Sequence, residues 1–176
     1  MKKKKNIANK SIEPFKKELW EELTWFIQES NRATADFINT LLALSNPDKI
    51  DSKQFKKDVI DRKRLTYNDE LEENLAKTEH LRWNAFYVAM GWKPIDIEEM
   101  RIKFPDTKTN GFRKNELAKL HICLAAWDKL DIISKTFCSI AQINKDFNFK
   151  DNDRDFIKNI PFIIDGAERV KTHKKQ

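Results

Sequence analysis

Glycine and proline are scarce in this chain of 176 residues, which contains three glycines and five prolines. A sandwich or barrel of many short strands needs many turn-forming residues, so this scarcity argues against an all-β fold. No apolar run approaches the roughly 18–20 residues that span a bilayer. No apolar segment follows Lys2 to Lys5 either, so the pattern of a secretory signal is missing. We therefore expect a cytoplasmic protein without a membrane span.

Cysteine and histidine are also rare. Two cysteines, Cys123 and Cys138, do not make a disulfide framework. Together with the three histidines (His80, His121 and His173) they show none of the CxxC or HxxxH spacings that are typical of metal sites. Glycine-rich phosphate loops of the P-loop or Rossmann kind are absent as well. The sequence thus predicts no metal site and no cofactor.

Positive charge is concentrated at the two ends of the chain. The formal net charge is +6, but eight of the 34 basic residues lie in terminal runs, namely Lys2 to Lys5, Arg169, Lys171, Lys174 and Lys175. Without these eight, 26 basic residues stand against 28 acidic ones. A nucleic-acid-binding protein is expected to carry a basic stripe on its folded body. We therefore expect no nucleic-acid partner, and we interpret residues 1–10 and 167–176 as disordered basic tails.

Hydrophobic residues make up 40% of the chain and recur mostly at helical spacing. Residues 11–166 are expected to form a single helical domain. Steps of three and four predict helices over 12–26, with Ser11 as N-cap, and over 33–44. Further helices are expected near residues 55–60 and 130–140, and from Asp151 onward until Pro161 interrupts the last one.

The best-defined helix is predicted from Asp69 to Met90. Asn68 is its expected N-cap, and the acidic residues that follow suit the positive end of the helix dipole. Gly91 is placed to end the helix in a left-handed conformation, and Trp92 is expected to pack back on the last turn.

Residues 95–113 interrupt the helical pattern. Apolar and charged residues alternate from Met100 to Phe104, which predicts a short strand, and Asn110-Gly111 is typical of a hairpin turn. The predicted fold is therefore mainly α, a compact helical domain with a small β-hairpin excursion.

Two segments of the chain resemble each other. Trp20 is followed by Ser30-Asn31-Arg32, and Trp127 is followed by Asn152-Asp153-Arg154, with the second copy carrying an insertion. One interpretation is a pseudo-two-fold pair of helical hairpins that presents equivalent groups to a central cleft. The other is chance similarity between two amphipathic helices, because a short repeat at unequal spacing is a weak signal.

The densest group of chemically versatile side chains is Glu79-His80-Leu81-Arg82-Trp83. On a helix, Glu79 and Arg82 share one face, and so do His80 and Trp83. One turn therefore offers a carboxylate, an imidazole, a guanidinium and an indole, which together suit a planar, partly anionic ligand such as a nucleotide derivative. The structural alternative is a buried Trp83, with Glu79 and Arg82 paired to hold neighbouring elements.

The same residues open a longer pattern that resembles a known family. The segment Leu75–Trp83 reads L-A-K-T-E-H-L-R-W and is followed by Gly91-Trp92, by K-L-H-I-C-L from Lys119 and by W-D-K-L from Trp127. This order is similar to that of the ryanodine-receptor repeat (RyR) domain, whose prokaryotic form reads approximately L-x-x-x-E-H-x-R-W, G-W, K-L-H-P-C-L and W-D-x-L.

The resemblance covers most of residues 20–164. Asn152-Asp153-Arg154 resembles the K-D-R that opens the family's last helix, and Glu29 to Arg32 resembles a segment that often precedes the domain. The stretch from Lys93 to Ala118 departs from the family, because it is longer and lacks the family's tyrosine, glycine and arginine-aspartate. Ile122 replaces the family's proline.

The resemblance implies a stand-alone module of prokaryotic or phage type that binds a ligand and is not an enzyme. Similar prokaryotic domains are thought to sense nucleotide-derived ligands, including signals used in defence against phages. The expected ligand is therefore a nucleotide, a cyclic nucleotide or a related anionic signal. Arg82 and Arg32 are expected to contact phosphate, with Arg154 as a weaker candidate. The stacking surface is expected from Trp83, Trp92 or Trp127. Hydrogen bonds to polar edges are expected from Glu79, His80 and His121.

Two other functions stay open from the sequence. The first is an interaction or structural module that docks to itself, as a homo-oligomer, or to a channel or effector subunit. The second is catalysis, with Glu79 and either His80 or His121 as a general acid–base pair. No nucleophile stands at recognisable spacing, so we do not expect an enzyme. An open cleft around Glu79, Arg82 and His121 would favour ligand binding, whereas their burial in mutual pairs would favour docking.

Overall fold

The computed structural model describes residues 13–104, 113–143 and 146–173. These residues form the helices α1 (Glu13–Glu21), α2 (Trp25–Leu44), α3 (Ser52–Arg62), α4 (Asp69–Ala89), α5 (Ile97–Lys103), α6 (Leu130–Ala141) and α7 (Lys150–His173). They also form the strands β1 (Lys93–Pro94), β2 (Lys114–Asn115) and β3 (Leu120–His121), and a 3₁₀ turn, η2 (Trp127–Lys129). The prediction of a mainly α fold with a small β excursion is confirmed.

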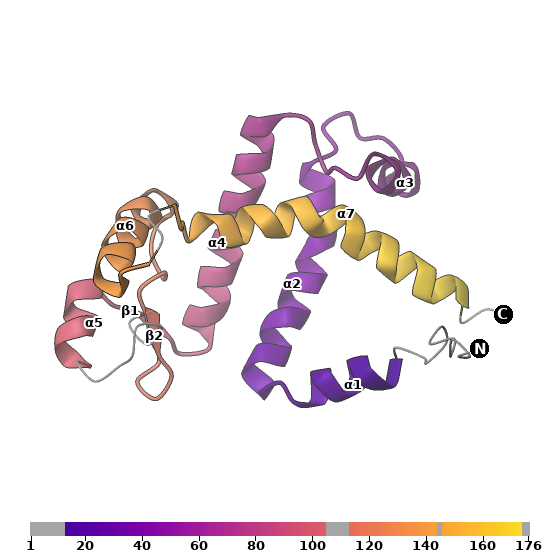
Figure 1. Cartoon of the computed structure of the whole chain (residues 1–176). Coiled ribbons are helices and arrows are strands. Elements are labelled where there is room, and N and C mark those ends of the chain that lie inside the picture. Colours follow the sequence, from indigo (N-terminus) through magenta and orange to yellow (C-terminus); the bar gives the residue numbers. More distant parts are fainter. Residues whose placement is uncertain (1–12, 105–112, 144–145, 174–176) are drawn as a thin grey trace, which may run out of the picture.

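Helix α4 lies at the centre of the molecule (Figure 1) and packs against α2 and α7. Helix α7 crosses α4 and continues to α3, on which it also packs. The small sheet and the helices α5 and α6 gather on one side of α4 (Figure 1). As a result, α2, the middle of α4, the start of α7 and the small sheet lie next to one another.

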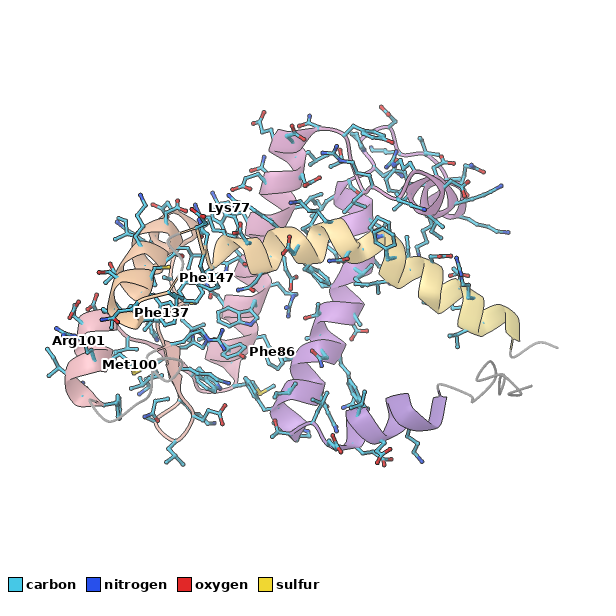
Figure 2. The ribbon with its side chains drawn as sticks, in the orientation of Figure 1. Lys77, Phe86, Met100, Arg101, Phe137 and Phe147 are labelled. Atoms are coloured by element: carbon cyan, nitrogen blue, oxygen red, sulfur yellow. The ribbon has the colours of Figure 1, made fainter. Side chains whose placement is uncertain are left out.

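One hydrophobic cluster joins the helices from α2 to α7. Its least exposed members include Leu41 of α2, Val59 of α3, Leu75 of α4 and Ile157 of α7. Met100 and Phe137 belong to the same cluster and lie where α5 and α6 meet (Figure 2). Burial of a Leu or Ile side chain contributes about 1.5–3 kcal/mol, so these contacts fix the relative positions of the helices.

The predicted signals at the ends of α4 are confirmed. The side chain of Asn68 accepts a hydrogen bond from Leu71 N at 2.9 Å, which caps the first turn. Gly91 adopts a φ of +82°, a left-handed conformation that glycine tolerates best. The N–H of Trp92 then donates to Tyr87 O at 3.0 Å, and its ring lies 5.2 Å from the Tyr87 ring.

The predicted helix over residues 12–26 is wrong in its boundaries. The chain leaves the helix after Glu21, and α2 begins at Trp25 with Thr24 as N-cap. The side-chain amide of Gln28 donates to the carbonyl oxygens of Trp20 and Leu23, at 2.9 and 3.2 Å, so the carbonyls freed by the break are satisfied. The predicted N-cap Ser11 lies outside the described residues.

The strand predicted for residues 100–104 is also wrong, because this segment belongs to α5. Asp96 caps it by accepting from Glu98 N and Glu99 N, at 2.8 and 3.3 Å. Ion pairs one turn apart, between Arg101 and Glu98 and between Lys103 and Glu99, further favour the helix. The predicted hairpin turn at residues 110–111 lies outside the described residues.

The sheet forms from other residues than those predicted. Strand β3 is central, parallel to β1 and antiparallel to β2. Its register pairs Lys93 with Leu120 and Lys114 with His121. The sheet therefore ties the C-terminal end of α4 to the hairpin of β2 and β3.

Helix α7 continues where the sequence predicts an interruption. Pro161 is fully buried inside it, and the helix runs through Gly166 to His173. Proline removes one intrahelical hydrogen bond, but Ile157, Ile160 and Ile164 pack into the core on either side of it. The expectation of a disordered tail from residue 167 is thus wrong as far as His173, while residues 1–12 and 174–176 lie outside the described part of the chain.

No helix within residues 13–104, 113–143 and 146–173 is long and apolar enough to cross a membrane.

Candidate ligand-binding site

A cavity of about 400 Å³ lies between α2, α4, the start of α7 and the hairpin of β2 and β3. The lining residues include five of the nine that the sequence predicts, namely Glu79, His80, Arg82, Trp83 and His121. Four of them come from the central part of α4, so the helical clustering seen in the sequence does place them around one space.

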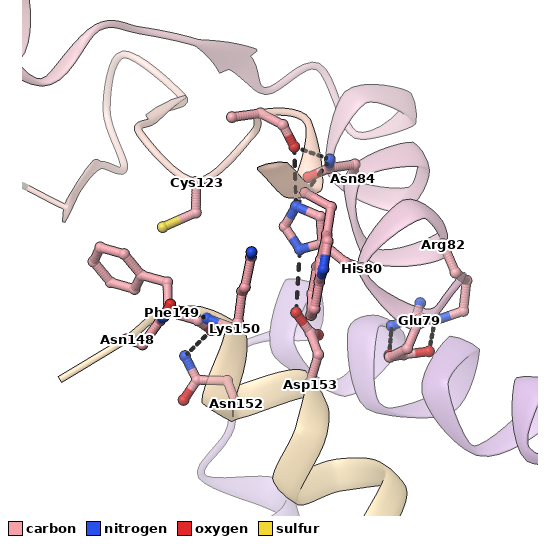
Figure 3. Close-up of polar contacts among 12 residues, drawn as sticks. Glu79, His80, Arg82, Asn84, Cys123, Asn148, Phe149, Lys150, Asn152 and Asp153 are labelled. Carbon is pink, nitrogen blue, oxygen red and sulfur yellow. Dashed lines mark hydrogen bonds and ion pairs between the residues drawn. The ribbon is translucent and has the colours of Figure 1, made fainter. Parts of the chain in front are cut away.

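The Glu79 carboxylate and the Arg82 guanidinium form a bidentate pair in the cavity wall (Figure 3). Arg82 Nε donates to Glu79 Oε2 at 2.8 Å, and Nη2 donates to Oε1 at 2.6 Å. Nη2 also donates to Thr34 Oγ1 of α2 at 2.9 Å. The side chains are 5% and 12% exposed, and burial raises the pKa of Glu79 while Arg82 opposes this rise.

One nitrogen of the Arg82 guanidinium has no hydrogen-bond partner in the part of the chain that the structure describes. Arg82 Nη1 is buried and has no hydrogen-bond partner within the described residues. A guanidinium carries five N–H donors in a fixed fork, so a bidentate pair does not satisfy all of them. An unsatisfied buried donor costs about 1–3 kcal/mol, so Nη1 is an unmet hydrogen-bond donor, shielded from solvent, on a residue that lines the cavity.

His80 bridges α4 and α7. Its Nδ1 lies 3.2 Å from Asp153 Oδ2, and its Nε2 lies 3.0 Å from the carbonyl oxygen of Ala125 (Figure 3). Asn84 Nδ2 donates to the same carbonyl at 2.9 Å. Nε2 also lies 3.3 Å from Asn84 Nδ2, so both ring nitrogens have polar neighbours. His80 therefore both lines the cavity and connects α4 to α7 and to the segment that contains Ala125.

His121 contributes a neutral imidazole on the opposite side. Burial lowers the pKa of His121 to about 3, and the nearby charge of Arg113 acts in the same direction. Nδ1 accepts a hydrogen bond from Cys123 N at 3.0 Å, so the single proton of the neutral ring is on Nε2. His121 therefore supplies an N–H donor at neutral pH.

Aromatic rings pack tightly beside this donor. Trp83 lies 4.2 Å from Tyr87 and meets the His121 ring at 5.0 Å, edge to face. His80 stacks on Trp83 at 5.9 Å. Trp83 and Tyr87 are half-buried and line the cavity, so they offer apolar surface to a flat ring.

Two basic residues of the hairpin line the cavity and were missed in the sequence. Arg113 is exposed, and the structure shows no acceptor for its guanidinium among the residues it describes. Lys114 Nζ lies 2.7 Å from the exposed carboxylate of Glu116. Both belong to the segment 93–118, where the family pattern is absent, so no sequence signal marked them.

Two predicted tryptophans lie outside the cavity lining. Trp92 is 6% exposed and packs against Phe26 and Tyr87. Trp127 is 8% exposed, and its Nε1 donates to Glu73 at 3.2 Å. Their surroundings are those of core residues, so the stacking role expected for them has no geometric support.

The predicted arginines Arg32 and Arg154 also lie outside the lining. Arg154 donates two hydrogen bonds of 2.8 Å to Glu73 and lies over the Trp127 ring at 5.8 Å. Arg32 pairs with Glu29 and lies over Trp20 at 5.3 Å. Both guanidinium groups are engaged within the protein, which removes the geometric basis for the expected phosphate contacts.

The internal similarity of the sequence has a counterpart in the structure. Each copy places its arginine over its tryptophan, as Arg32 with Trp20 and Arg154 with Trp127. The residues just before each arginine line the same cavity from opposite helices, Ser30 and Asn31 from α2 and Asn152 and Asp153 from α7. The two segments thus line one cavity, and whether they form a pseudo-two-fold pair stays a prediction.

The lining also contains a thiol and several hydrogen-bonding and charged side chains. Cys123 is the thiol in the wall, and burial raises its pKa to about 12, so it is protonated at neutral pH. In the part of the chain that the structure describes, no three or more His, Cys, Asp and Glu side chains are grouped so that they could hold a metal ion. The lining offers hydrogen-bond donors, three basic side chains (Arg82, Arg113 and Lys114) and aromatic surface.

Comparisons with protein-family models, curated proteins and solved structures find no match for this chain. The fold and the site together define its class: a mainly α-helical protein with a small mixed sheet and a polar cavity between three helices and a hairpin. The resemblance to the RyR domain stays a prediction.

Proposed function

We propose that this protein is a cytoplasmic sensing module of the RyR-repeat type that binds a small anionic, ring-containing ligand such as a nucleotide or cyclic nucleotide. The observation that carries the proposal is the unsatisfied, buried Nη1 of Arg82 in the wall of a cavity of about 400 Å³. Small-molecule sites typically enclose about 300–1,000 Å³ and combine apolar walls with a few placed polar groups. A ligand oxygen that accepts from Nη1 would offset the cost of leaving this donor unpaired.

The rest of the lining supports the same ligand class. Arg113 and Lys114 offer positive charge, which suits a phosphate. Trp83 and Tyr87 offer ring surface, and the Nε2 proton of His121 offers a donor to a polar edge. The proposal gives no role to the Cys123 thiol, which burial holds protonated.

The test is isothermal titration of the full chain against ribonucleoside 5′-monophosphates, their 3′,5′-cyclic forms and cyclic dinucleotides. We expect at least one of these compounds to bind at 1:1 stoichiometry. Arg101→Ala is the matched surface control, because Arg101 is an exposed arginine on α5 that does not line the cavity. If the circular dichroism spectrum shows a folded protein and no member of the panel binds, the proposal fails.

The second candidate is a module that docks to itself or to a channel or effector subunit. The observation that favours it is the mutual burial of Glu79 and Arg82, which serves a structural role without any ligand. Sedimentation velocity over a wide range of protein concentration, with and without the nucleotides, separates the two candidates. Self-association without nucleotide binding favours docking, and a monomer that binds a nucleotide favours sensing.

A further inference from the structure

The two ends of the cavity differ in charge. At the inner end, the Arg82 guanidinium is already neutralised by the Glu79 carboxylate, at 2.6 Å and 2.8 Å. The carboxylate of Asp153 lines the same region, is bound to His80 and raises the pKa of Glu79 through its negative charge. A phosphate placed here would meet two carboxylates in a desolvated site, which is costly.

The inner end is nevertheless a good place for a neutral acceptor. Arg82 Nη1 is an unsatisfied N–H donor that is shielded from solvent and whose positive charge is balanced. An uncharged oxygen that reaches it through a small shift of the side chain can accept from it without bringing a new charge into the wall. Ring carbonyls and sugar hydroxyls are acceptors of this kind.

The hairpin end has the opposite character. Arg113 is exposed and shows no acidic partner in the described segments, and Lys114 has one exposed carboxylate, Glu116, beside it. The charge of Arg113 reaches His121, Tyr87 and Cys123, which places the guanidinium at the cavity and not away from it. An anion bound here keeps part of its hydration while it gains charge-assisted hydrogen bonds.

We infer that the cavity is polarised, with the ligand's anionic group bound at the hairpin by Arg113 and Lys114 and an uncharged ring or sugar oxygen bound by Arg82 Nη1. This inference rests on the proposed function and deepens it. It transfers the phosphate contact expected for Arg32 and Arg82 to Arg113, a specificity-determining residue. The class of ligand is then a nucleoside phosphate whose charge is confined to one end.

The polarity predicts how salt and charge act on binding. The contact at Arg113 is exposed and is screened by salt, because the Debye length is only about 8 Å at physiological ionic strength. The contact at Arg82 is buried and is screened much less. A nucleoside without phosphate should therefore bind more weakly than its nucleotide, with little dependence on salt.

The experiment compares the nucleotides of the panel with their parent nucleosides on the wild-type chain, Arg113→Ala, Arg82→Lys and the control Arg101→Ala. We expect Arg113→Ala to weaken nucleotide binding about tenfold and to change nucleoside binding less than twofold. Arg82→Lys, which keeps the charge but removes the fork of donors, should weaken both compounds by a similar factor. Arg101→Ala should change neither.

The outcomes separate the inference from the function on which it rests. If no nucleotide binds to the folded wild-type chain, both are overturned. If a nucleotide binds but Arg113→Ala leaves its affinity and its salt dependence unchanged, the polarised arrangement is wrong and the proposed function stands. Where Arg82→Lys does not fold, the salt dependence of wild-type binding to nucleotide and nucleoside decides alone.

Discussion

His80 Nδ1 lies 3.2 Å from Asp153 Oδ2, so two side chains 73 positions apart in the sequence join the middle of α4 to the first turn of α7. The imidazole is 3% exposed, and its other nitrogen is held by the carbonyl oxygen of Ala125. This contact fixes the angle between two of the helices that enclose the cavity, so the shape of the site depends on it.

Asp153→Ala is expected to lower the free energy of unfolding by about 1–3 kcal/mol, because a buried donor of His80 loses its acceptor. Urea denaturation followed by circular dichroism measures the change. The matched control is Asp155→Ala, two positions along α7, where the side chain is exposed and a change within about 0.5 kcal/mol is expected. Equal effects of the two substitutions would show that the His80 contact contributes nothing to stability.

The stability of the fold should fall in acid through His121. The pKa of this imidazole is about 3 in the folded chain against the ordinary value of 6.5, because burial disfavours the cation. As the pH drops below 6.5 the unfolded chain takes up a proton that the folded chain does not, so the free energy of unfolding decreases towards pH 3, by at most about 1.4 kcal/mol per pH unit.

The replacement His121→Asn removes this titration and retains an acceptor for the N–H of Cys123. Unfolding free energies measured from pH 7 to pH 4 should therefore decline less steeply for the variant than for the wild-type chain. Parallel profiles for the two proteins would contradict the assignment of a buried, neutral imidazole.

Cys123 and Cys138 should resist thiol reagents in the folded protein. Both are buried, and burial raises the pKa of Cys123 to about 12, so almost no reactive thiolate exists at neutral pH. With 5,5′-dithiobis-(2-nitrobenzoic acid), the release of two equivalents of chromophore is expected to be slow in buffer and rapid in denaturing urea. Immediate reaction of either thiol in buffer would show that its burial is incomplete.

Two glycines are expected to respond to alanine in opposite directions. Gly166 lies within α7, and a Cβ added to it meets nothing within 4 Å, so Gly166→Ala should stabilise the protein by about 0.5–1 kcal/mol. Gly91 has a φ of +82°, which strains any residue with a Cβ, so Gly91→Ala should destabilise it by a similar amount or more. Thermal unfolding of both variants gives the two signs, and a loss of stability in Gly166→Ala would argue against a helix at that point.

Local signals in the sequence predicted α4 well, because Asn68, Gly91 and Trp92 act on backbone groups only a few residues away. The predicted helix over residues 12–26 and the predicted interruption at Pro161 were wrong because contacts between distant residues decide both. The break between α1 and α2 depends on where the amide of Gln28 reaches, and the passage of α7 through Pro161 depends on isoleucines that pack against other helices. Neither contact has a signature in the spacing of residues.

The candidate site shows the same difference between local signals, which the sequence contains, and non-local contacts, which it does not. Glu79, His80 and Arg82 line one cavity because they lie within one turn of α4. The sequence places them close together for the same reason. Trp127 and Arg154 lie outside the lining, because each contacts the other and Glu73, and the sequence does not show these contacts. Arg113 lies at the cavity because β2, which follows it, pairs with β3. The sequence analysis missed it, because strands of two residues are too short to show an alternating hydrophobic pattern.

The walls of the cavity are made at very different times during synthesis. Helices α2 and α4 are translated before α7, which brings Asn152 and Asp153 to the cavity. Until α7 docks, His80 lacks its carboxylate and one side of the cavity is missing. This side of the cavity is therefore closed only after α7 has been translated and has docked on α4.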